Sequence, residues 1–274
     1  VLSGYLMSGG NLEIIIKVLP YEGMMIGGMA VGATVIANSF GVQKQIFGGI
    51  VRVLKGEKWK KKDYADALLL MFELAKIKAT KGLQGLDNEA ENPGESELFK
   101  KYPRIAKDHF AINLITDTLK AMTMNLDDPN TTEELMKHRL KAHHHHAVAP
   151  ATALSNLADA LPAIGIVAAV LGVIKTMASV DAPPEVLGEK IGGALVGTCM
   201  GVFLSYGLVG PLAKRLEQIE DKDGAFYHVI ANMLISMMND DQALICVERG
   251  RSSIPGGMEP TFNEIEEKTR EIRV

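Results

Sequence analysis

The sequence has few of the residues on which enzymes and small secreted domains depend. It contains two cysteines, Cys199 and Cys246, and they form neither a disulfide framework nor a metal-binding spacing. No glycine-rich phosphate loop ends in Lys-Ser or Lys-Thr, and no Ser/His/Asp or Cys/His combination stands out. The net charge of −4 argues against a nucleic-acid-binding surface. These absences predict a protein that is not an enzyme and has no metal, cofactor or nucleic-acid partner.

Charge is also missing from one long stretch of the chain. Residues 191–213, between Lys190 and Lys214, carry no charged side chain. An α-helix needs about 20 apolar residues to cross the hydrocarbon of a bilayer. Small residues recur here at every fourth position and form a flat stripe, which another helix can approach closely. The stripe consists of Gly193, Gly197, Gly201 and Ser205. The stretch therefore predicts a membrane helix that packs against other helices.

Two further stretches are long and apolar enough to cross a membrane. Residues 23–43 are free of charge, and residues 160–180 are interrupted only by Lys175, whose long side chain can reach the interface. Residues 1–10 are too short to cross alone, and because the sequence begins with Val1 rather than Met, we expect the start of a first span to be missing. The mean hydropathy of +0.10 fits a chain partly in lipid and partly in water. We predict an all-α membrane protein with four transmembrane helices, the first truncated, and a helical cytoplasmic domain.

Basic residues set the predicted orientation. Lysine and arginine are frequent after residue 43 and again after residue 213, whereas residues 181–190 form a short, acidic loop. The positive-inside rule therefore places the basic flanks in the cytoplasm. The predicted organisation has transmembrane helices one (partial) and two in residues 1–43 and a cytoplasmic helical domain in residues 44–156. Transmembrane helices three and four follow in residues 157–213, and cytoplasmic C-terminal helices in residues 214–274.

The predicted cytoplasmic segments carry apolar residues at helical spacing. Residues 64–78 and 110–122 predict helices, and residues 212–238 predict a long helix that continues out of the membrane. Residues 131–141 predict another helix, beginning after Asn130 with Glu133 in a capping arrangement.

A run of four histidines separates this helix from the third span. It comprises His143, His144, His145 and His146. Four adjacent histidines on a helix cannot all face one metal ion, so we interpret the run as a cytoplasmic linker. Its titration near neutral pH would make it sensitive to acidification, although nothing in the sequence requires this role.

The centres of the predicted spans hold no Asp, Glu, His or Arg. An ion that crosses a bilayer normally needs a titratable or coordinating group near the midplane. If the protein conducts ions, we therefore expect the carboxylate to come from a partner helix.

Four polar or helix-breaking residues in or beside the spans have two interpretations each. Pro162 and Pro211 each remove a backbone donor at a similar depth of consecutive spans, either as functional kinks or as tolerated prolines. Thr198 either lines a pore or bonds its own helix backbone. Asp159 is either an ion exit group or an anchor at the membrane edge.

Motifs distributed along the whole chain carry a family resemblance. They read LPAIGIVAAVLG (residues 161–172), VGTCMG (196–201), YGLVGPLA (206–213), ENPGESELFKKYPR (91–104), VERGR (247–251) and PTFNEIEE (260–267). In this order they resemble the MotA family of flagellar motor stator subunits, within the MotA/TolQ/ExbB proton channel family.

The resemblance implies an assembly and an ion path. MotA-like subunits form a pentameric ring around a dimer of MotB, whose aspartate carries the proton. The family's functional prolines correspond to Pro162 and Pro211, and its pore-side threonine to Thr198. Ala169 stands where sodium-driven relatives carry threonine, which favours H⁺ as the transported ion. The implied protein is a multi-pass subunit of the bacterial inner membrane that supports motility, and chemotaxis only indirectly.

The resemblance also implies a contact with the rotor protein FliG. The acidic contact residue corresponds to Asp87, where glutamate is usual. The basic one corresponds to Ala79, so we expect neighbouring Lys78 or Lys81 to serve, unless these are ordinary solvated charges. Two alternative functions remain open, namely an ExbB/TolQ-like energiser of outer-membrane processes and a non-conducting membrane scaffold.

Overall fold

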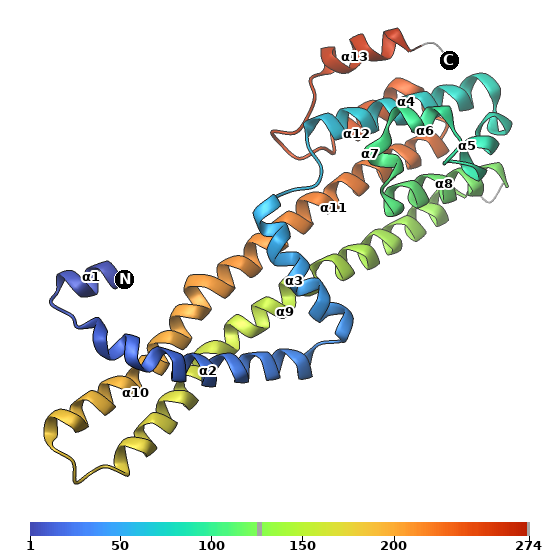
Figure 1. The fold of residues 1–274 in the computed structure, drawn as a ribbon. Helices are drawn as coiled ribbons and strands as arrows, with labels where there is room; N and C mark the ends of the chain where they lie inside the picture. The colour runs from blue at the N-terminus through green and yellow to red at the C-terminus, as the bar shows by residue number, and fades with distance from the viewer. Residues whose placement is uncertain (125–127, 273–274) are drawn as a thin grey trace. The chain divides into compact units, whose positions relative to one another are not determined.

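The structure is a computed structural model that describes residues 1–124 and 128–272, and every regular element within them is helical (Figure 1). The chain divides into two compact units. Unit 1 consists of Val1–Lys55 and Val148–Gln218, and unit 2 of Gly56–Ala147 and Ile219–Val274. The all-helical prediction is confirmed for the described residues.

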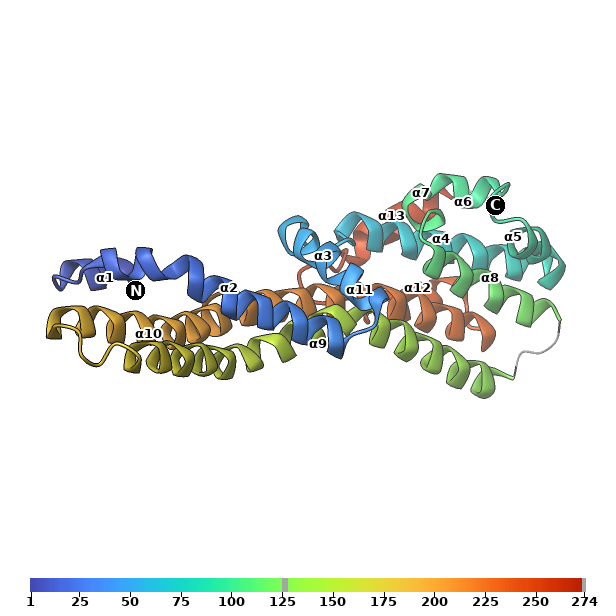
Figure 2. The ribbon, with the colours of Figure 1, turned by 60° about the horizontal axis from the view of Figure 1, so that its bottom comes forward.

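Unit 1 is built from long apolar helices. Helix α2 packs against α10, and α9 and α10 form a hairpin (Figure 2). Its complete elements are α1 (Leu2–Met7), α2 (Leu12–Ala37), α3 (Phe40–Lys55), α10 (Pro184–Leu204) and the π-helical segment η2 (Ser205–Val209). Two longer helices are shared with unit 2. Helix α9 (Pro129–Met177) belongs to unit 1 from Val148 onward, and α11 (Gly210–Met238) belongs to it as far as Gln218.

Three described segments are long and apolar enough to cross a membrane, namely Leu12–Ala37, Pro129–Met177 and Pro184–Met238. The last two contain the helical parts of the predicted spans 160–180 and 191–213. Large apolar side chains of α9, such as Ile166, Val170 and Ile174, are exposed in the single chain, as expected for a surface that meets lipid or a partner. The predicted fourth, truncated span falls on the short helix α1 and stays a prediction.

The predicted bounds of the second span, residues 23–43, were wrong. Helix α2 begins after Asn11, whose side chain accepts a hydrogen bond from the Glu13 amide at 2.7 Å. It ends before Asn38, which adopts an extended conformation. The first half was missed because it contains charges, yet Glu13 and Lys17 form an exposed ion pair at 3.0 Å within the helix.

Helix α9 also differs from the prediction, because it is one continuous helix. It begins at Pro129 rather than after Asn130, and Asp128 accepts a hydrogen bond from the Thr131 amide at 3.1 Å. The four histidines therefore lie inside α9 and are not a linker. One of them, His143, packs within unit 2, where its ring stacks on Phe110 with centroids 3.7 Å apart.

Unit 2 has a conventional apolar core. Trp59 stacks on Phe226 with ring centroids 3.9 Å apart, and Tyr64 meets Phe226 edge-on at 5.3 Å. The predicted helices 64–78, 110–122 and 212–238 are confirmed within α4, α8 and α11. Besides parts of α9 and α11, the unit contains α4 (Lys61–Lys81), η1 (Leu83–Leu86), α5 (Asp87–Glu91), α6 (Glu97–Lys101), α7 (Pro103–Ala106), α8 (His109–Thr123), α12 (Ala243–Arg251) and α13 (Phe262–Glu271).

Candidate ion pathway and partner surface

The small-residue stripe of α10 lies between two helices. A Cβ added at Gly201 would lie 2.6 Å from the Leu161 carbonyl oxygen of α9, and one added at Gly193 would lie 3.0 Å from Val18 of α2. All four stripe residues are buried, and Ser205 is 2% exposed. The stripe therefore allows the backbone of α10 to approach both neighbours closely, which is how small residues promote helix association in membranes.

Helix α9 contributes small residues of its own to the same contact. A Cβ at Gly165 would lie 2.8 Å from the Gly197 carbonyl oxygen, and a Cβ at Gly172 would lie 2.8 Å from the Ala194 side chain. Side chains larger than those present have no room on this face. The result is a smooth contact between the two helices of the hairpin.

The helix after α10 changes its winding near Pro211. Ser205–Val209 is π-helical, and the Gly210 amide donates to the Ser205 carbonyl, five residues back. Proline has no N–H to donate to the carbonyl four residues before it, so its position favours such a change. Pro211 is exposed, whereas Pro162 is half-buried within an unbroken α9. The sequence predicted a possible kink at Pro211 but not its π-helical form.

The other predicted ion-path residues lie on α9 and α10. Ala169 and Thr198 are half-buried, and the Ala169 amide nitrogen lies 3.3 Å from the place of a Cβ at Gly197. The structure thus brings Ala169 together with the residue that precedes Thr198. Asp159 is exposed and lies one helical turn before Pro162 on α9, away from this contact.

Helix α2 contains an acidic residue that the sequence analysis missed. Glu22 is 3% exposed, and its Oε2 accepts no hydrogen bond from the described residues. The predicted spans hold no acid at their centres, but Glu22 lies just outside the predicted span 23–43 and inside the observed helix α2. The signal was present, because Glu22 is the single charge between Lys17 and Lys44, but the predicted span began one residue later.

The predicted rotor-contact residues lie in unit 2, and the structure separates their roles. Lys78 is only 15% exposed, and its Nζ donates to the Met237 carbonyl and to Asp240 Oδ1, both at 2.6 Å. Lys81 and Asp87 are exposed at either end of the short turn η1. Lys78 thus stabilises the end of α11, whereas Lys81 and Asp87 are accessible to a partner.

Unit 2 also encloses a charged cluster that the sequence analysis did not identify. Asp108 accepts hydrogen bonds from Lys58, from the Ala111 amide at 2.7 Å and from the Tyr227 hydroxyl at 3.1 Å. Burial alone would raise the pKa of Asp108, but these donors together hold the pKa below its ordinary value. The carboxylate is thus a fixed negative charge that anchors the N-terminus of α8.

Burial disfavours protonation of two histidines in unit 2. Burial lowers the pKa of His143, against the opposing effect of the Asp108 charge, and burial also lowers the pKa of His228. Protonation of either ring is therefore less favourable in the folded protein than in the unfolded chain.

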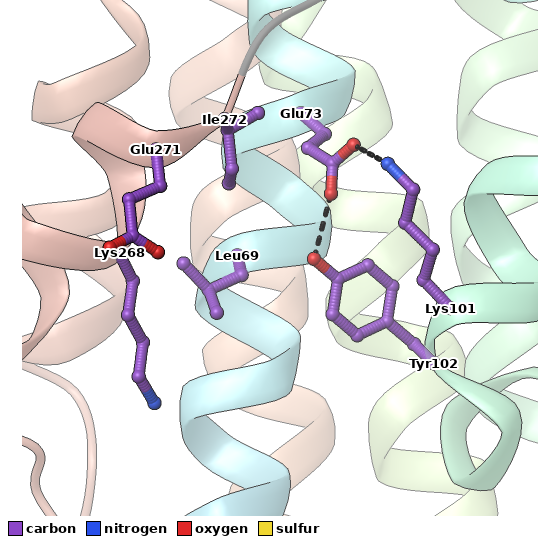
Figure 3. Close-up of a pocket in the computed structure, with 7 residues that line it drawn as sticks. All are labelled: Leu69, Glu73, Lys101, Tyr102, Lys268, Glu271 and Ile272. Carbon is purple, nitrogen blue, oxygen red and sulfur yellow. Dashed lines mark hydrogen bonds and ion pairs between the residues drawn. The ribbon is translucent and has the colours of Figure 1, made fainter.

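A cavity of about 510 Å³ lies between α4, α6 and α13 (Figure 3). Glu73 is its buried acid and accepts hydrogen bonds from the Tyr102 hydroxyl at 2.8 Å and from Lys101 Nζ at 2.6 Å. The remaining lining residues are Leu69, Lys268, Glu271 and Ile272. Because Glu73 is satisfied by its neighbours and the predicted site residues do not line the cavity, we assign the Glu73 cluster to stability.

Comparison with known proteins places these features in a family. Residues 1–82 match the family described as Motility protein A N-terminal, and residues 106–223 match the MotA/TolQ/ExbB proton channel family. Motility protein A of Salmonella typhimurium is 35% identical over 273 residues, covering 100% of this chain and 92% of that protein. The Escherichia coli protein of the same name is 34% identical with the same coverage. Chemotaxis protein LafT of Vibrio parahaemolyticus is 31% identical, covering 97% of this chain and 93% of that protein.

Solved structures share the fold. The structure of C. jejuni MotAB matches with a TM-score of 0.72 at 18% identity, over 93% of this chain and 91% of that chain. The flagellar MotAB stator complex from Bacillus subtilis matches with a TM-score of 0.70 at 18% identity, over 96% and 92%.

The fold and the matches define a class, the multi-pass helical membrane proteins of the MotA/TolQ/ExbB proton channel family. Within this class the chain belongs to the motility protein A family and is a stator subunit of the bacterial flagellar motor. The resemblance noted in the sequence is thereby confirmed. The match of residues 1–82 to a family specific to motility protein A favours a stator over an ExbB/TolQ-like energiser.

Proposed function

We propose that this stator subunit forms, with MotB, a channel of the inner membrane that conducts H⁺ and converts its flow into rotation. A pentameric ring of this chain would surround a MotB dimer, whose aspartate binds the proton. The shared fold with two MotAB structures supports this assembly. The observation that carries the proposal is the close contact of α9 with α10 through glycine and alanine, next to the π-helical turn before Pro211.

The energetics fit a small movement. One proton crossing the membrane releases roughly 2.3 kcal/mol per 100 mV. This free energy is enough to bias a rotation of a smooth helix surface, but not to unfold a helix. Protonation of the MotB carboxyl would change its contact with the helices that carry Pro162 and Pro211, and the ring would turn by a small angle.

The alanine at position 169 supports H⁺ rather than Na⁺ as the transported ion. Sodium needs several oxygen ligands in place of its water, whereas a carboxylate binds a proton alone. Ala169 offers no hydroxyl, and its amide nitrogen lies in the tight contact with Gly197. No resident cofactor takes part in this proposal.

A proton-flux assay tests the channel. The chain is co-expressed with its MotB partner, reconstituted in vesicles, and the flux is measured after a potential is applied. We expect a flux that disappears when the partner aspartate is replaced by asparagine and decreases in the Pro162→Leu variant. An assembled complex without flux would favour the scaffold.

The rotor contact is proposed for Lys81 and Asp87 rather than Lys78. Exposed ion pairs are each worth about 1 kcal/mol or less, which suits contacts that must form and break rapidly. We expect Lys81→Glu and Asp87→Lys to slow swimming without lowering the yield of the complex. Lys78→Ala should instead lower the melting temperature, because it removes the contacts with Met237 and Asp240. If Lys81→Glu swims at the normal speed, the assignment to FliG contact is wrong.

A further inference from the structure

Glu22 lies in a membrane-crossing helix without a partner that would explain its burial. Its Oε2 receives no hydrogen bond from the described residues, and the residue is 3% exposed. An ionised carboxylate in such a place is costly, and intramembrane acids usually belong to ion or proton routes. The carboxyl therefore requires either a bound proton or a group that approaches it during the working cycle.

Three helices of unit 1 meet at this carboxyl. A Cβ at Gly197 of α10 would lie 2.5 Å from Glu22 Oε2 and 3.3 Å from the Ala169 amide nitrogen of α9. Glu22 Oε2 and the Ala169 amide nitrogen thus both border the space that is open because residue 197 has no side chain. This space adjoins Ala169 and Thr198, two positions of the proposed ion path, although Glu22 comes from a different helix.

The surroundings select a proton over a metal ion. No group of three or more His, Cys, Asp or Glu side chains that suits a metal ion occurs among the described residues. A single carboxyl oxygen cannot replace the hydration of a sodium ion, but it can bind a proton.

We propose that Glu22 is a second proton-binding site of the channel, supplied by this chain, that passes H⁺ to and from the carboxyl of the partner. Uptake converts the carboxylate to the neutral acid, and release transfers the same proton to the next carboxylate, so no further reactant is needed. The inference rests on the proposed H⁺ conduction. The inference goes beyond the proposed function because it places a titrating group on the ring subunit as well as on the partner.

Chemical labelling of the wild-type complex tests the protonated state. Dicyclohexylcarbodiimide modifies protonated carboxyls in apolar surroundings, and mass spectrometry locates the adduct. We expect labelling of Glu22 at neutral pH that declines as the medium becomes alkaline. Exposed Glu189, which pairs with Lys17, serves as the internal control and should stay unlabelled. Absence of the adduct at Glu22 at acidic, neutral and alkaline pH would overturn the proposal.

Substitution then tests the transfer. Glu22→Gln keeps the size of the side chain but binds no exchangeable carboxyl proton. Positioned acid–base groups typically contribute 10²-fold or more to proton transfer, so we expect the flux to fall by at least about tenfold. Glu22→Asp should recover part of the flux, and Glu189→Gln should leave it unchanged.

The outcomes separate the two proposals. A wild-type complex that assembles but conducts no H⁺ contradicts the proposed function itself. Equal flux in the wild type and in Glu22→Gln contradicts only the role of Glu22. If Glu22→Gln does not assemble with MotB, the labelling of the wild-type complex decides.

Discussion

The two units are stabilised in different ways. Unit 2 has an aromatic and aliphatic core, and its buried acids include Asp63, Glu73 and Asp108, each of which has a partner. Unit 1 has two small apolar clusters and close backbone contacts at glycine and alanine, and it exposes large apolar side chains. One buried carboxyl oxygen of this unit accepts no hydrogen bond from the described residues. Unit 2 therefore pairs these buried carboxylates internally, whereas the buried carboxyl of unit 1 lacks such a partner among the described residues.

The largest effect should come from the aromatic core of unit 2. Phe226 is fully buried against Trp59 and Tyr64. Phe226→Ala should cost about 3–5 kcal/mol, because it leaves a cavity that helices cannot close. Chemical denaturation of the purified complex measures the loss, with exposed Phe262→Ala as the matched control. If both variants unfold at the same denaturant concentration, the core is misassigned.

A smaller loss of stability is expected in unit 1, where the substitution enlarges a side chain instead of shortening it. Gly201→Ala places a methyl group 2.6 Å from a backbone oxygen, and such overpacking costs about 1–3 kcal/mol. We expect weaker assembly with MotB and slower swimming. Gly28→Ala is the control, since a Cβ there meets nothing within 4 Å. Equal assembly of the two variants would show that the stripe does not control helix packing.

The smallest effect should be a pH dependence confined to unit 2. The pKa of His143 is lowered in the folded protein, so near and below the ordinary histidine value of about 6.5 the unfolded chain binds more protons. Stability should therefore fall as the pH falls through this range. His143→Phe keeps the stacking on Phe110 and should flatten the slope of melting temperature against pH, whereas exposed His145→Phe should not. An unchanged slope in His143→Phe would exclude this histidine as the cause.

The difference between the units also explains what the sequence could predict. Apolar periodicity revealed α4, α8 and α11, because each buries one face, and the charge-free run revealed α10. The start of α2 was missed because Glu13 and Lys17 look like an aqueous loop, although they neutralise each other on the helix surface. The continuity of α9 was missed because the histidine run resembles a linker.

The site was only partly predictable for a related reason. The four-residue spacing of Gly193, Gly197, Gly201 and Ser205 was enough to indicate close helix packing. It could not show that Gly197 leaves room for a carboxyl of α2, because this contact joins residues 22 and 197. Nor could it show that Lys78 is occupied by the end of α11 while Lys81 lies exposed. Both contacts join residues that are far apart in the sequence, and the spacing of residues within one helix does not reveal them.

The central claim is that a proton gradient drives this stator subunit, and swimming speed tests it most directly. The chain and its MotB partner are expressed in a strain that lacks stators, and speed is measured first without sodium and then with a protonophore. We expect normal speed in the first condition and arrest in the second. Arrest on removal of sodium, with swimming preserved in the protonophore, would contradict the account.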